Sequence, residues 1–558
     1  MKNVERYRKN PVLKYPEREW PDKEILKAPM WCSVDLRDGN QALIDPMIVE
    51  EKIEFFEMLV KLGFKEIEIG FPAASQIEYD FLRQLVDRKL IPDDVWVQVL
   101  SQCREEQIER TFEAIEGIKN VVFHIYNSTS ILQRDVVFNM DKNEITGIAV
   151  NGTRWVKERA KNFPGNIRLE YSPESFTGTE VEYALEICTA VQKEWQPTKD
   201  NPLIINLPAT VELNTPNVYA DMVEWMNKHF EDRESIILSV HPHNDRGTGI
   251  AATELALLAG ADRIEGTLFG NGERTGNIDI LNIAYNMFMD GIDPCLNIEN
   301  INEIIEVYER LVKMPIDDRH PYAGKLVFTA FSGSHQDAIN KGVKAMKERN
   351  SGIWQVPYLT IDPADIGRVY EPIVRINSQS GKGGVAFIMD TYFGFKLPKG
   401  MHKEFAKVIQ AITEQKGEIS PDEIMDEFRK NYIDKKEPLH FRKLKVDDRS
   451  DSDDTEFDTH VTLTYTKHDK EECFEAVGNG PIDAVLRGLK ENLGLEIKVL
   501  DYEEHALAGG ASAQAAAYIH LLDAEDGRVT YGVGVSSNIT RASVRAMFSA
   551  INRLELVK

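Results

Sequence analysis

Three consecutive stretches of the chain form one repeating unit: MWCSVDL (30–36), DPMIVEEKIEFFEMLVKLG (45–63) and EIEIGFP (66–72). The first and third are short, largely apolar runs of the kind found in strands. The second places apolar residues three and four positions apart, which is the spacing of an amphipathic helix. A strand, a helix and a second strand in this order predict a βαβ unit with parallel strands.

The same unit recurs up to about residue 290. The strand candidates span residues 30–36, 66–72, 96–100, 120–126, 166–172, 203–209, 235–241 and 263–269. Eight such units in about 260 residues match an α/β fold, the (β/α)8 TIM barrel. An open doubly wound sheet is the competing interpretation, but no G-x-G-x-x-G follows the first strand.

The pattern changes after the barrel, first to helical segments and then to strands. The predicted domains are an N-terminal arm at 1–29, the barrel at 30–325, a helical linker domain at 326–436 and a C-terminal α+β domain at 437–558. A strongly charged stretch at 435–458 is interpreted as a solvated hinge. Beyond it, two rounds of strands followed by a helix predict a small pseudo-repeated domain with a regulatory or oligomeric role.

Composition narrows the classes of protein to consider. The chain has 558 residues, of which 42% are hydrophobic, and its formal net charge is -25. Such a charge repels nucleic acids and anionic membranes. Its five cysteines are odd in number and lack C-x-x-C spacing, and no apolar run approaches the length of a membrane span or a signal peptide. We therefore expect a cytoplasmic protein with no nucleic-acid or membrane partner.

Polar side chains gather where the predicted strands end, and a TIM barrel carries its active site at that face. The relevant stretches are DLRDGNQ (35–41), YSPES (171–175), LPATVE (207–212), HPHND (241–245) and GNGERTGN (270–277).

Four of these side chains have the chemistry of metal ligands. His241 and His243 are two residues apart, so an extended strand points both to the same face. Asp38 supplies a carboxylate oxygen from another strand end, and Asn277 can add an amide oxygen. Two nitrogens and two oxygens predict a site for Mg²⁺, Mn²⁺ or Zn²⁺. The alternative is a polar plug that stabilises the barrel mouth.

DLRDGNQ, LPATVE, HPHND and GNGERTGN, in this order, resemble the 2-isopropylmalate synthase family, part of the metal-dependent Claisen-condensing barrel superfamily. The resemblance covers nearly the whole chain and indicates the longer form of the family. Its further matches are YSPESFTGTE (171–180), FSGSHQDAINKG (331–342), WQVPYL (354–359), NSQSGKGG (377–384) and the C-terminal domain. The resemblance implies an acyltransferase that joins acetyl-CoA, 2-oxoisovalerate and water to give 2-isopropylmalate and CoA, the committing step of leucine biosynthesis.

The resemblance also implies roles for the four predicted metal ligands and for Arg37. An ion held by Asp38, His241, His243 and Asn277 would chelate the keto acid through its ketone and carboxylate oxygens. Arg37 would hold the ketone or a developing oxyanion, since its guanidinium stays charged. A salt bridge to Asp38 is the alternative role for Arg37.

The remaining barrel residues are expected to bind substrate. Thr210 would bind the keto-acid carboxylate, with a plain helix N-cap as its alternative. His124 and Glu174 would shape the pocket or move protons, unless they are ordinary buried hydrogen-bonded groups. Gly272 and Arg274 would bind the pyrophosphate or thioester of CoA.

A histidine and a tyrosine of the linker are similar to family residues delivered by a partner subunit. These are His335 and Tyr358, so the resemblance implies an obligate homodimer whose active site is completed in trans. His335 is one candidate for the general base, and Glu174 acting through water is the other. The alternative for His335 is a surface helix histidine. The sequence leaves open which divalent ion is native and whether K⁺ activates.

The resemblance further implies that the C-terminal domain binds leucine and lowers activity. The candidate effector residues are Ala508, Gly509, Gly510 and Ala511 in HALAGGASAQAAAY (505–518). The family often carries an acidic residue at this point, whereas this chain reads AGGASAQA. Dimer packing through small residues is the alternative.

Three other functions remain to be distinguished from the main hypothesis. Citramalate synthase and homocitrate synthase use the same chemistry with a different keto acid. A non-catalytic metabolite sensor would keep the barrel only as a scaffold, and it predicts degraded site motifs.

Overall fold

The computed structural model describes residues 4–6, 10, 12–330, 332–350, 352–370, 376–377, 382–416, 418–433, 435–448, 459–507 and 513–557. They form two compact units. The first comprises the chain up to Phe328 with Ile361–Val369, and the second comprises Thr329–Thr360 with the chain from Tyr370 onward. Residues 361–369 of the predicted linker therefore belong with the barrel, and the four domain boundaries stay predictions.

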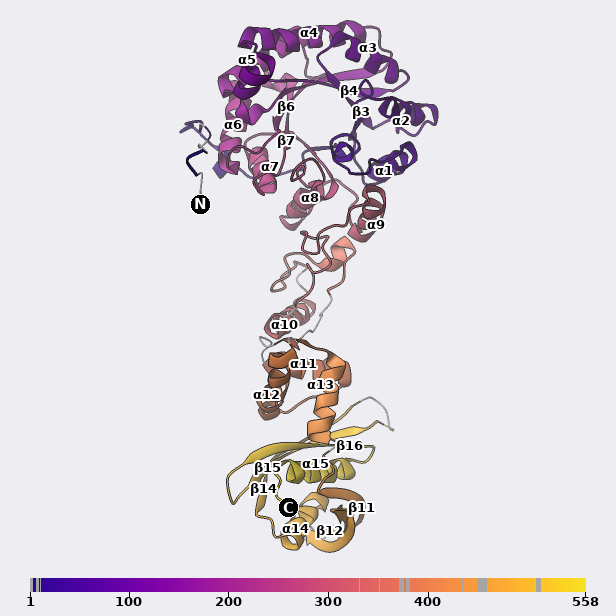
Figure 1. Cartoon of the computed structure of the whole chain (residues 1–558), viewed down its shortest axis with the longest axis vertical. Helices are drawn as coiled ribbons and strands as arrows, with labels where there is room; N and C mark the ends of the chain where they lie inside the picture. Colours follow the sequence, from indigo (N-terminus) through magenta and orange to yellow (C-terminus); the bar gives the residue numbers. More distant parts are fainter. Residues whose placement is uncertain are drawn as a thin grey trace. The chain divides into compact units, whose positions relative to one another are not determined.

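The first unit is a closed barrel of parallel strands, seen as a ring in Figure 1. The strands lie in sequence order, and the first closes on the eighth with Met30 opposite Arg263 and Ser33 opposite Gly266. Their bounds are β1 Met30–Ser33, β2 Glu66–Gly70, β3 Trp96–Gln102, β4 Asn120–Ser128, β5 Asn166–Glu174, β6 Leu203–Ala209, β7 Ile236–Pro242 and β8 Arg263–Gly266. The predicted (β/α)8 fold is confirmed.

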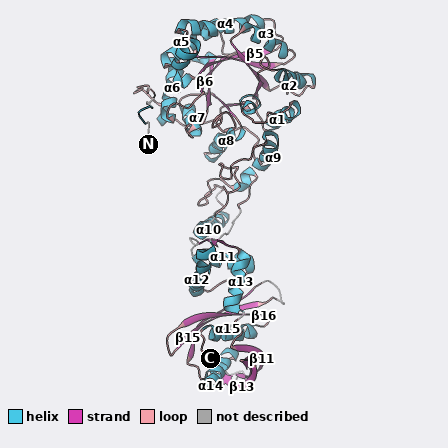
Figure 2. Ribbon diagram, in the orientation of Figure 1, coloured by secondary structure: helices cyan, strands magenta, loops and turns pink. Residues whose placement is uncertain are grey.

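A helix follows each strand and covers the outside of the barrel (Figure 2). Their bounds are α1 Val49–Lys61, α2 Gln76–Asp87, α3 Glu105–Ala114, α4 Lys142–Ala160, α5 Val181–Trp195, α6 Pro216–His229, α7 Gly249–Leu258 and α8 Ile280–Met289, with α9 Ile301–Val312 after them. Several begin at side-chain caps: Ser75 accepts from the N–H of Glu78, and Asp141 and Glu144 form a reciprocal capping box.

The barrel interior is charged where most such barrels are filled by branched apolar side chains. Arg263 is fully buried and donates to Glu66 (2.6 Å), Gln98 (2.6 Å) and Glu265 (3.0 Å). Buried charges persist only when they are paired and hydrogen-bonded. This network therefore fixes the positions of inward-facing side chains below the barrel mouth.

Strands β1, β2 and β8 end earlier than predicted, and the endings of β1 and β8 shape the mouth. After β1, Asp35–Gly39 forms a π-helical turn in which the N–H groups of Asp38 and Gly39 donate to the carbonyl of Val34. After β8, Phe269 adopts a left-handed conformation with φ of 56°. The chain therefore turns across the mouth at both places.

The second unit contains helices and two three-stranded antiparallel sheets. Its elements are α10 Gly333–Arg349, β9 Ile376–Asn377, α11 Lys382–Phe393, α12 Lys399–Lys416, β10 Glu418–Ile419, α13 Pro421–Phe428, β11 Leu439–Asp448, β12 Thr459–Lys467, β13 Lys470–Gly478, α14 Pro481–Leu493, β14 Ile497–Ala506, β15 Ala515–Asp523, β16 Val529–Ser536 and α15 Ile539–Arg553. Across the described residues of both units, no helix has the length and apolar character needed to cross a membrane.

The interpretation of 435–458 as a solvated hinge is wrong for its first half. Strand β11 pairs with β12 over Leu439–Asp448, and Leu439 and Phe441 are buried in the core of the C-terminal sheets. Residues 449–458 lie outside the described residues. The missed strand completes the pseudo-repeat, because each round then consists of three strands followed by a helix.

Candidate metal centre and active site

Three buried side chains from two strand ends meet at one point. Asp38, His241 and His243 each offer a ligand atom, and these atoms lie within 4.8 Å of one another. The Oδ2 of Asp38 is 3.6 Å from Nε2 of His241 and 3.8 Å from Nε2 of His243. Asn277 donates to Asp38 (2.7 Å), and its own Oδ1 is buried without a hydrogen-bond partner. This donor set fits a divalent ion, so the structure brings together the four residues predicted as ligands.

Local backbone geometry explains why these residues converge. The π-helical turn after β1 carries Asp38, and β7 with the residue after it carries both histidines on one face. Asn277 forms an isolated antiparallel bridge with His243, which ties the 270–277 loop to the end of β7. The tie is reinforced because the N–H of Asn244 donates to the carbonyl of Gly276 (3.1 Å).

The backbone at Gly276 requires a glycine. Its φ is +91°, and a Cβ at this position would overlap the carbonyl oxygen of Gly270. We expect Gly276→Ala to displace the loop and with it Asn277, at a cost of about 1–3 kcal/mol. Metal affinity should fall along with the melting temperature. The control is Gly247→Ala, where φ is also positive (+70°) but no atom lies within 4 Å of the added Cβ. Equal metal affinity in the two variants would contradict this role of the loop.

Burial and neighbouring charges shift the pKa values of all three side chains. Burial opposes ionisation of Asp38, but Arg37 and then the two histidines hold the pKa of its carboxyl well below the usual range. Burial also disfavours a charge on His241, yet hydrogen bonds with Asp38 and Glu265 raise its pKa to about 9. For His243, burial and the neighbouring His241 lower the pKa to about 4. At neutral pH Asp38 is therefore anionic and His243 is unprotonated, whereas His241 carries a proton that a bound ion would displace.

His124, Glu170 and Glu265 form a second close group of potential ligand atoms. Arg263 lies among them, 3.4 Å from Glu170 and 3.0 Å from Glu265. Burial, and then the charge of Glu265, raise the pKa of Glu170 well above its usual range. Because the guanidinium of Arg263 already pairs with both carboxyl groups, we assign this group to the ion network of the barrel interior.

Arg37 is held between two carboxylates. Its Nε donates to Glu68 (2.6 Å) and its Nη1 donates to Asp38 (2.6 Å). Burial opposes its charge, but Glu68 and Asp38 outweigh this and raise the pKa of the guanidinium. The side chain lines the cavity beside the metal group, so the predicted salt bridge and a position at the site occur together.

The cavity beside the metal group has a volume of about 230 Å³. It is lined by Arg37, Asp38, Gln41, Phe71, Leu100, His124, Tyr126, Ser172, Glu174, Asn206, Pro208, Thr210, His241, His243, Glu273 and Arg274. The predicted substrate residues of the barrel, apart from Gly272, therefore face one enclosure.

His124 and Glu174 both have hydrogen-bond partners within this enclosure. The Nδ1 of His124 lies 3.0 Å from Oε1 of Glu68, and its Nε2 lies 2.8 Å from the hydroxyl of Ser172. Glu174 accepts from the hydroxyl of Ser128. Both residues therefore line the cavity with hydrogen-bonded side chains, but His124 is buried whereas Glu174 is half-buried.

Thr210 follows β6 directly and accepts from the N–H of Ser175 (2.9 Å). The N-cap of α6 is Thr215, so the N-cap alternative for Thr210 is wrong. Arg274 is paired with Asp245 (2.7 Å) and donates to the carbonyl of Thr210 (2.6 Å). The sequence did not indicate Asp245 as a partner. Its carboxylate neutralises much of the positive charge of Arg274 that was predicted to contact CoA. Gly272 lies against Asn277, with no room for a Cβ.

The two linker residues belong to the second unit. His335 is exposed near the start of α10 and stacks on Tyr358, with ring centroids 4.1 Å apart. Tyr358 is 64% exposed. The candidate effector residues Ala508, Gly509, Gly510 and Ala511 lie outside the described residues.

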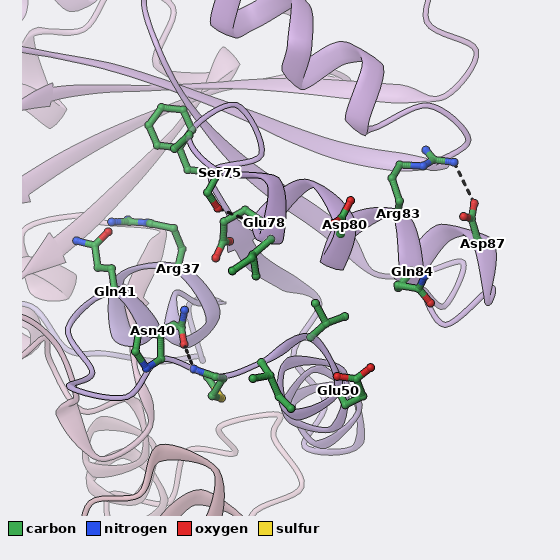
Figure 3. Close-up of a pocket in the computed structure, with 17 residues that line it drawn as sticks. Arg37, Asn40, Gln41, Glu50, Ser75, Glu78, Asp80, Arg83, Gln84 and Asp87 are labelled. Atoms are coloured by element: carbon green, nitrogen blue, oxygen red, sulfur yellow. Dashed lines mark hydrogen bonds and ion pairs between the residues drawn. The ribbon is translucent and has the colours of Figure 1, made fainter.

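A second cavity of about 1250 Å³ borders the first and shares Arg37, Gln41 and Phe71 with it. Figure 3 shows Arg37 and Gln41 at one end of this cavity and the ion pair of Arg83 with Asp87 at the other. Its walls come from the loop after β1, the start of α1 and helix α2.

Sequence reasoning missed two residues that support the site, Glu68 and Glu265. Both are fully buried in strands, where they accept hydrogen bonds from Arg37 and His241. A signal was present, because EIEIG (66–70) and RIEG (263–266) place charged side chains at alternate strand positions, which lie on one face of a strand.

Comparisons with known proteins cover the barrel and the rest of the chain. Residues 28–307 match the HMGL-like family model, and 325–390 match the "Alpha-isopropylmalate synthase, post-catalytic domain-like" model. Residues 418–555 match the "LeuA allosteric (dimerisation) domain" model. The chain therefore carries a dimerisation domain of an allosteric type.

Two curated relatives match along the whole chain. The 2-isopropylmalate synthase of Clostridium acetobutylicum is 52% identical, and the alignment covers 99% of each chain. That of Rhodospirillum rubrum is 51% identical and covers 98% of each. Among solved structures, the hydroxymethylglutaryl-CoA lyase from Pseudomonas aeruginosa is 18% identical with a TM-score of 0.43, covering 52% of this chain and 95% of that one. By its matches along the whole sequence, the chain belongs to the 2-isopropylmalate synthase family of acyltransferases.

Proposed function

We propose that this protein condenses acetyl-CoA with 2-oxoisovalerate and hydrolyses the thioester, giving 2-isopropylmalate and CoA. The observation that carries the proposal is the convergence of Asp38, His241, His243 and Arg37 on one cavity of a barrel mouth. The full-length identity to 2-isopropylmalate synthases supports the choice of keto acid.

The site residues divide the chemistry between them. Asp38, His241, His243 and Asn277 would hold a divalent ion, with Mg²⁺ as the first choice and Mn²⁺ or Zn²⁺ as alternatives. When bound, that ion supplies a Lewis acid that polarises the ketone and orients the keto acid. Arg37 donates to the ketone oxygen and stabilises the charge that develops there.

The other pocket residues bind and orient the substrates. The hydroxyl of Thr210 hydrogen-bonds the keto-acid carboxylate. His124 closes the pocket around the side chain of the keto acid. The larger cavity that begins at Arg37 and Gln41 suits the pantetheine arm of acetyl-CoA, while Gly272 and Arg274 contact the end of CoA nearest the thioester.

A base must remove a proton from the methyl group of acetyl-CoA. We assign this step to His335 of a second copy of the chain, oriented by its stacking on Tyr358. Glu174, acting through a water molecule, is the rival within the barrel. The rim of the barrel gives the second copy a surface to cover, because Ile131, Leu132 and Val136 are 51–70% exposed.

The C-terminal domain is proposed to bind leucine through Ala508, Gly509, Gly510 and Ala511 and to lower activity. K⁺ is proposed as an activator. The five cysteines, all free, support a reducing compartment such as the cytoplasm.

The keto acid is tested by measuring thiol release from acetyl-CoA with 2-oxoisovalerate, pyruvate and 2-oxoglutarate. We expect the highest kcat/KM with 2-oxoisovalerate, because the cavity wall beside the site includes Leu100, Phe71 and Pro208 and so favours a branched apolar side chain. Preference for pyruvate would indicate a citramalate synthase, and preference for 2-oxoglutarate a homocitrate synthase.

Completion of the site in trans is tested by mixing two inactive variants, Asp38→Ala and His335→Ala, after subunit exchange. Random exchange makes half of the dimers mixed, and each has one intact site, so we expect about a quarter of wild-type activity. Activity no higher than that of the separate variants would contradict a site shared between copies.

A further inference from the structure

We propose that Glu265, anchored by Arg263, is a positioning residue that fixes the tautomer and orientation of His241 for metal binding. The inference rests on the proposed function, because it takes the group of Asp38, His241 and His243 to be a metal site. It assigns a role to an ion network that lies beneath that site.

The hydrogen bonds of Glu265 show that its carboxylate acts only as an acceptor and is held in one orientation. Its Oε2 accepts from Nδ1 of His241 (2.7 Å) and from the amide of Asn206 (3.0 Å). Its Oε1 accepts from Arg263 (3.0 Å) and from the amide of Gln98 (2.8 Å). An ionised carboxylate is an acceptor with about four lone-pair sites, and all four are filled here. Glu265 therefore cannot rotate without losing a buried hydrogen bond.

The consequence for His241 follows from donor and acceptor roles. A carboxylate that only accepts requires Nδ1 of the ring to carry a hydrogen. In the neutral ring Nε2 is then the nitrogen with the free lone pair, and it faces Asp38 at 3.6 Å. Glu265 thus selects the tautomer whose lone pair points to the metal group, and such outer partners also raise ligand basicity.

The two histidines differ in whether a protein group selects the tautomer of the ring. The Nδ1 of His243 is buried without a hydrogen-bond partner, so no protein group selects its tautomer. His241 is the ligand that the protein orients in advance, and its support leads through Glu265 to Arg263 in the fully buried interior.

The test uses Glu265→Gln, which has the same shape. Arg263 keeps the amide oxygen of the new side chain on its own side, so the amide NH₂ faces His241 and Asn206. The ring must then accept at Nδ1 and carry its hydrogen on Nε2, which points it at the metal. We expect affinity for Mn²⁺, measured on the full-length protein by competition with a chelator, to fall about 10- to 100-fold.

The matched control is Glu66→Gln. Glu66 also accepts from Arg263 (2.6 Å) and is buried, but it accepts its other hydrogen bond from Arg168 (3.0 Å) and not from a ligand. Both variants should lower the melting temperature, whereas only Glu265→Gln should weaken Mn²⁺ binding. If Glu265→Gln fails to fold, Gln98→Met removes one donor to Glu265 without touching His241, and affinity should fall by a smaller factor.

The outcomes distinguish a failure of the proposed function from a failure of the role assigned to Glu265. Wild-type protein that binds no Mn²⁺ overturns the proposed function and this inference with it. Wild-type protein that binds Mn²⁺ while Glu265→Gln and Gln98→Met bind it equally well overturns only the inference. A parallel loss of affinity in Glu66→Gln would reduce Glu265 to a structural role.

Discussion

Replacing Asp38 by alanine is expected to lower turnover at least about 1000-fold, equivalent to about 4 kcal/mol of transition-state stabilisation, and to abolish retention of a divalent ion. Asp38 is the one carboxylate of the ligand group, and its charge is stabilised by Arg37 and both histidines. Without it, two imidazoles and a guanidinium face one another, which disfavours a cation. The measurement is kcat together with metal content after gel filtration.

The neighbouring Asp35 provides the control for this variant. It lies in the same π-helical turn and is buried, but it does not line the cavity. Burial raises its pKa to about 8, and an asparagine there keeps an amide oxygen that can accept from the N–H of Leu268, so we expect Asp35→Asn to retain its metal content. Retained metal content in Asp38→Ala, or an equal loss in Asp35→Asn, would contradict the assigned ligand group.

Replacing Arg37 by lysine is expected to lower kcat about 100- to 1000-fold while metal content stays near the wild-type level. The planar guanidinium spans Glu68 and Asp38 at 2.6 Å each, which a single ammonium cannot reproduce. Asp38 remains held by Asn277, so the ligand group keeps its shape. The measurement compares kcat, KM for the keto acid and metal stoichiometry.

Arg37→Lys distinguishes the two roles predicted for this residue. A role limited to balancing the charges of Glu68 and Asp38 is met by any cation, so it predicts kcat close to that of the wild type. A loss of metal in Arg37→Lys would instead mean that the arginine acts by holding Asp38 in place.

The barrel could be predicted because each strand is a short apolar run, and the helix after it places apolar residues three and four positions apart. The ends of strands were harder, since DLRDG (35–39) continues the strand pattern of β1 but folds into a π-helical turn. Strand β11 was missed because the alternating charges of FRKLKVDD (441–448) resemble a solvated segment, although Leu439 and Phe441 are buried.

The metal ligands could be predicted because the chemistry of H-x-H at a strand end is local. The strand pattern points Glu68 and Glu265 inward, but it does not identify their partners Arg37 and His241, which are 31 and 24 residues away and meet them only when the barrel closes. The pairing of Arg274 with Asp245 escaped prediction for the same reason.

The most direct test of the account is the position of Mn²⁺ in a crystal of the full-length protein with 2-oxoisovalerate, located by anomalous scattering. We expect one peak in each barrel mouth, within about 2.0–2.4 Å of ligand atoms of Asp38, His241 and His243, with the keto acid in contact. A peak at any other group of residues, or a keto acid bound away from these side chains, would contradict it.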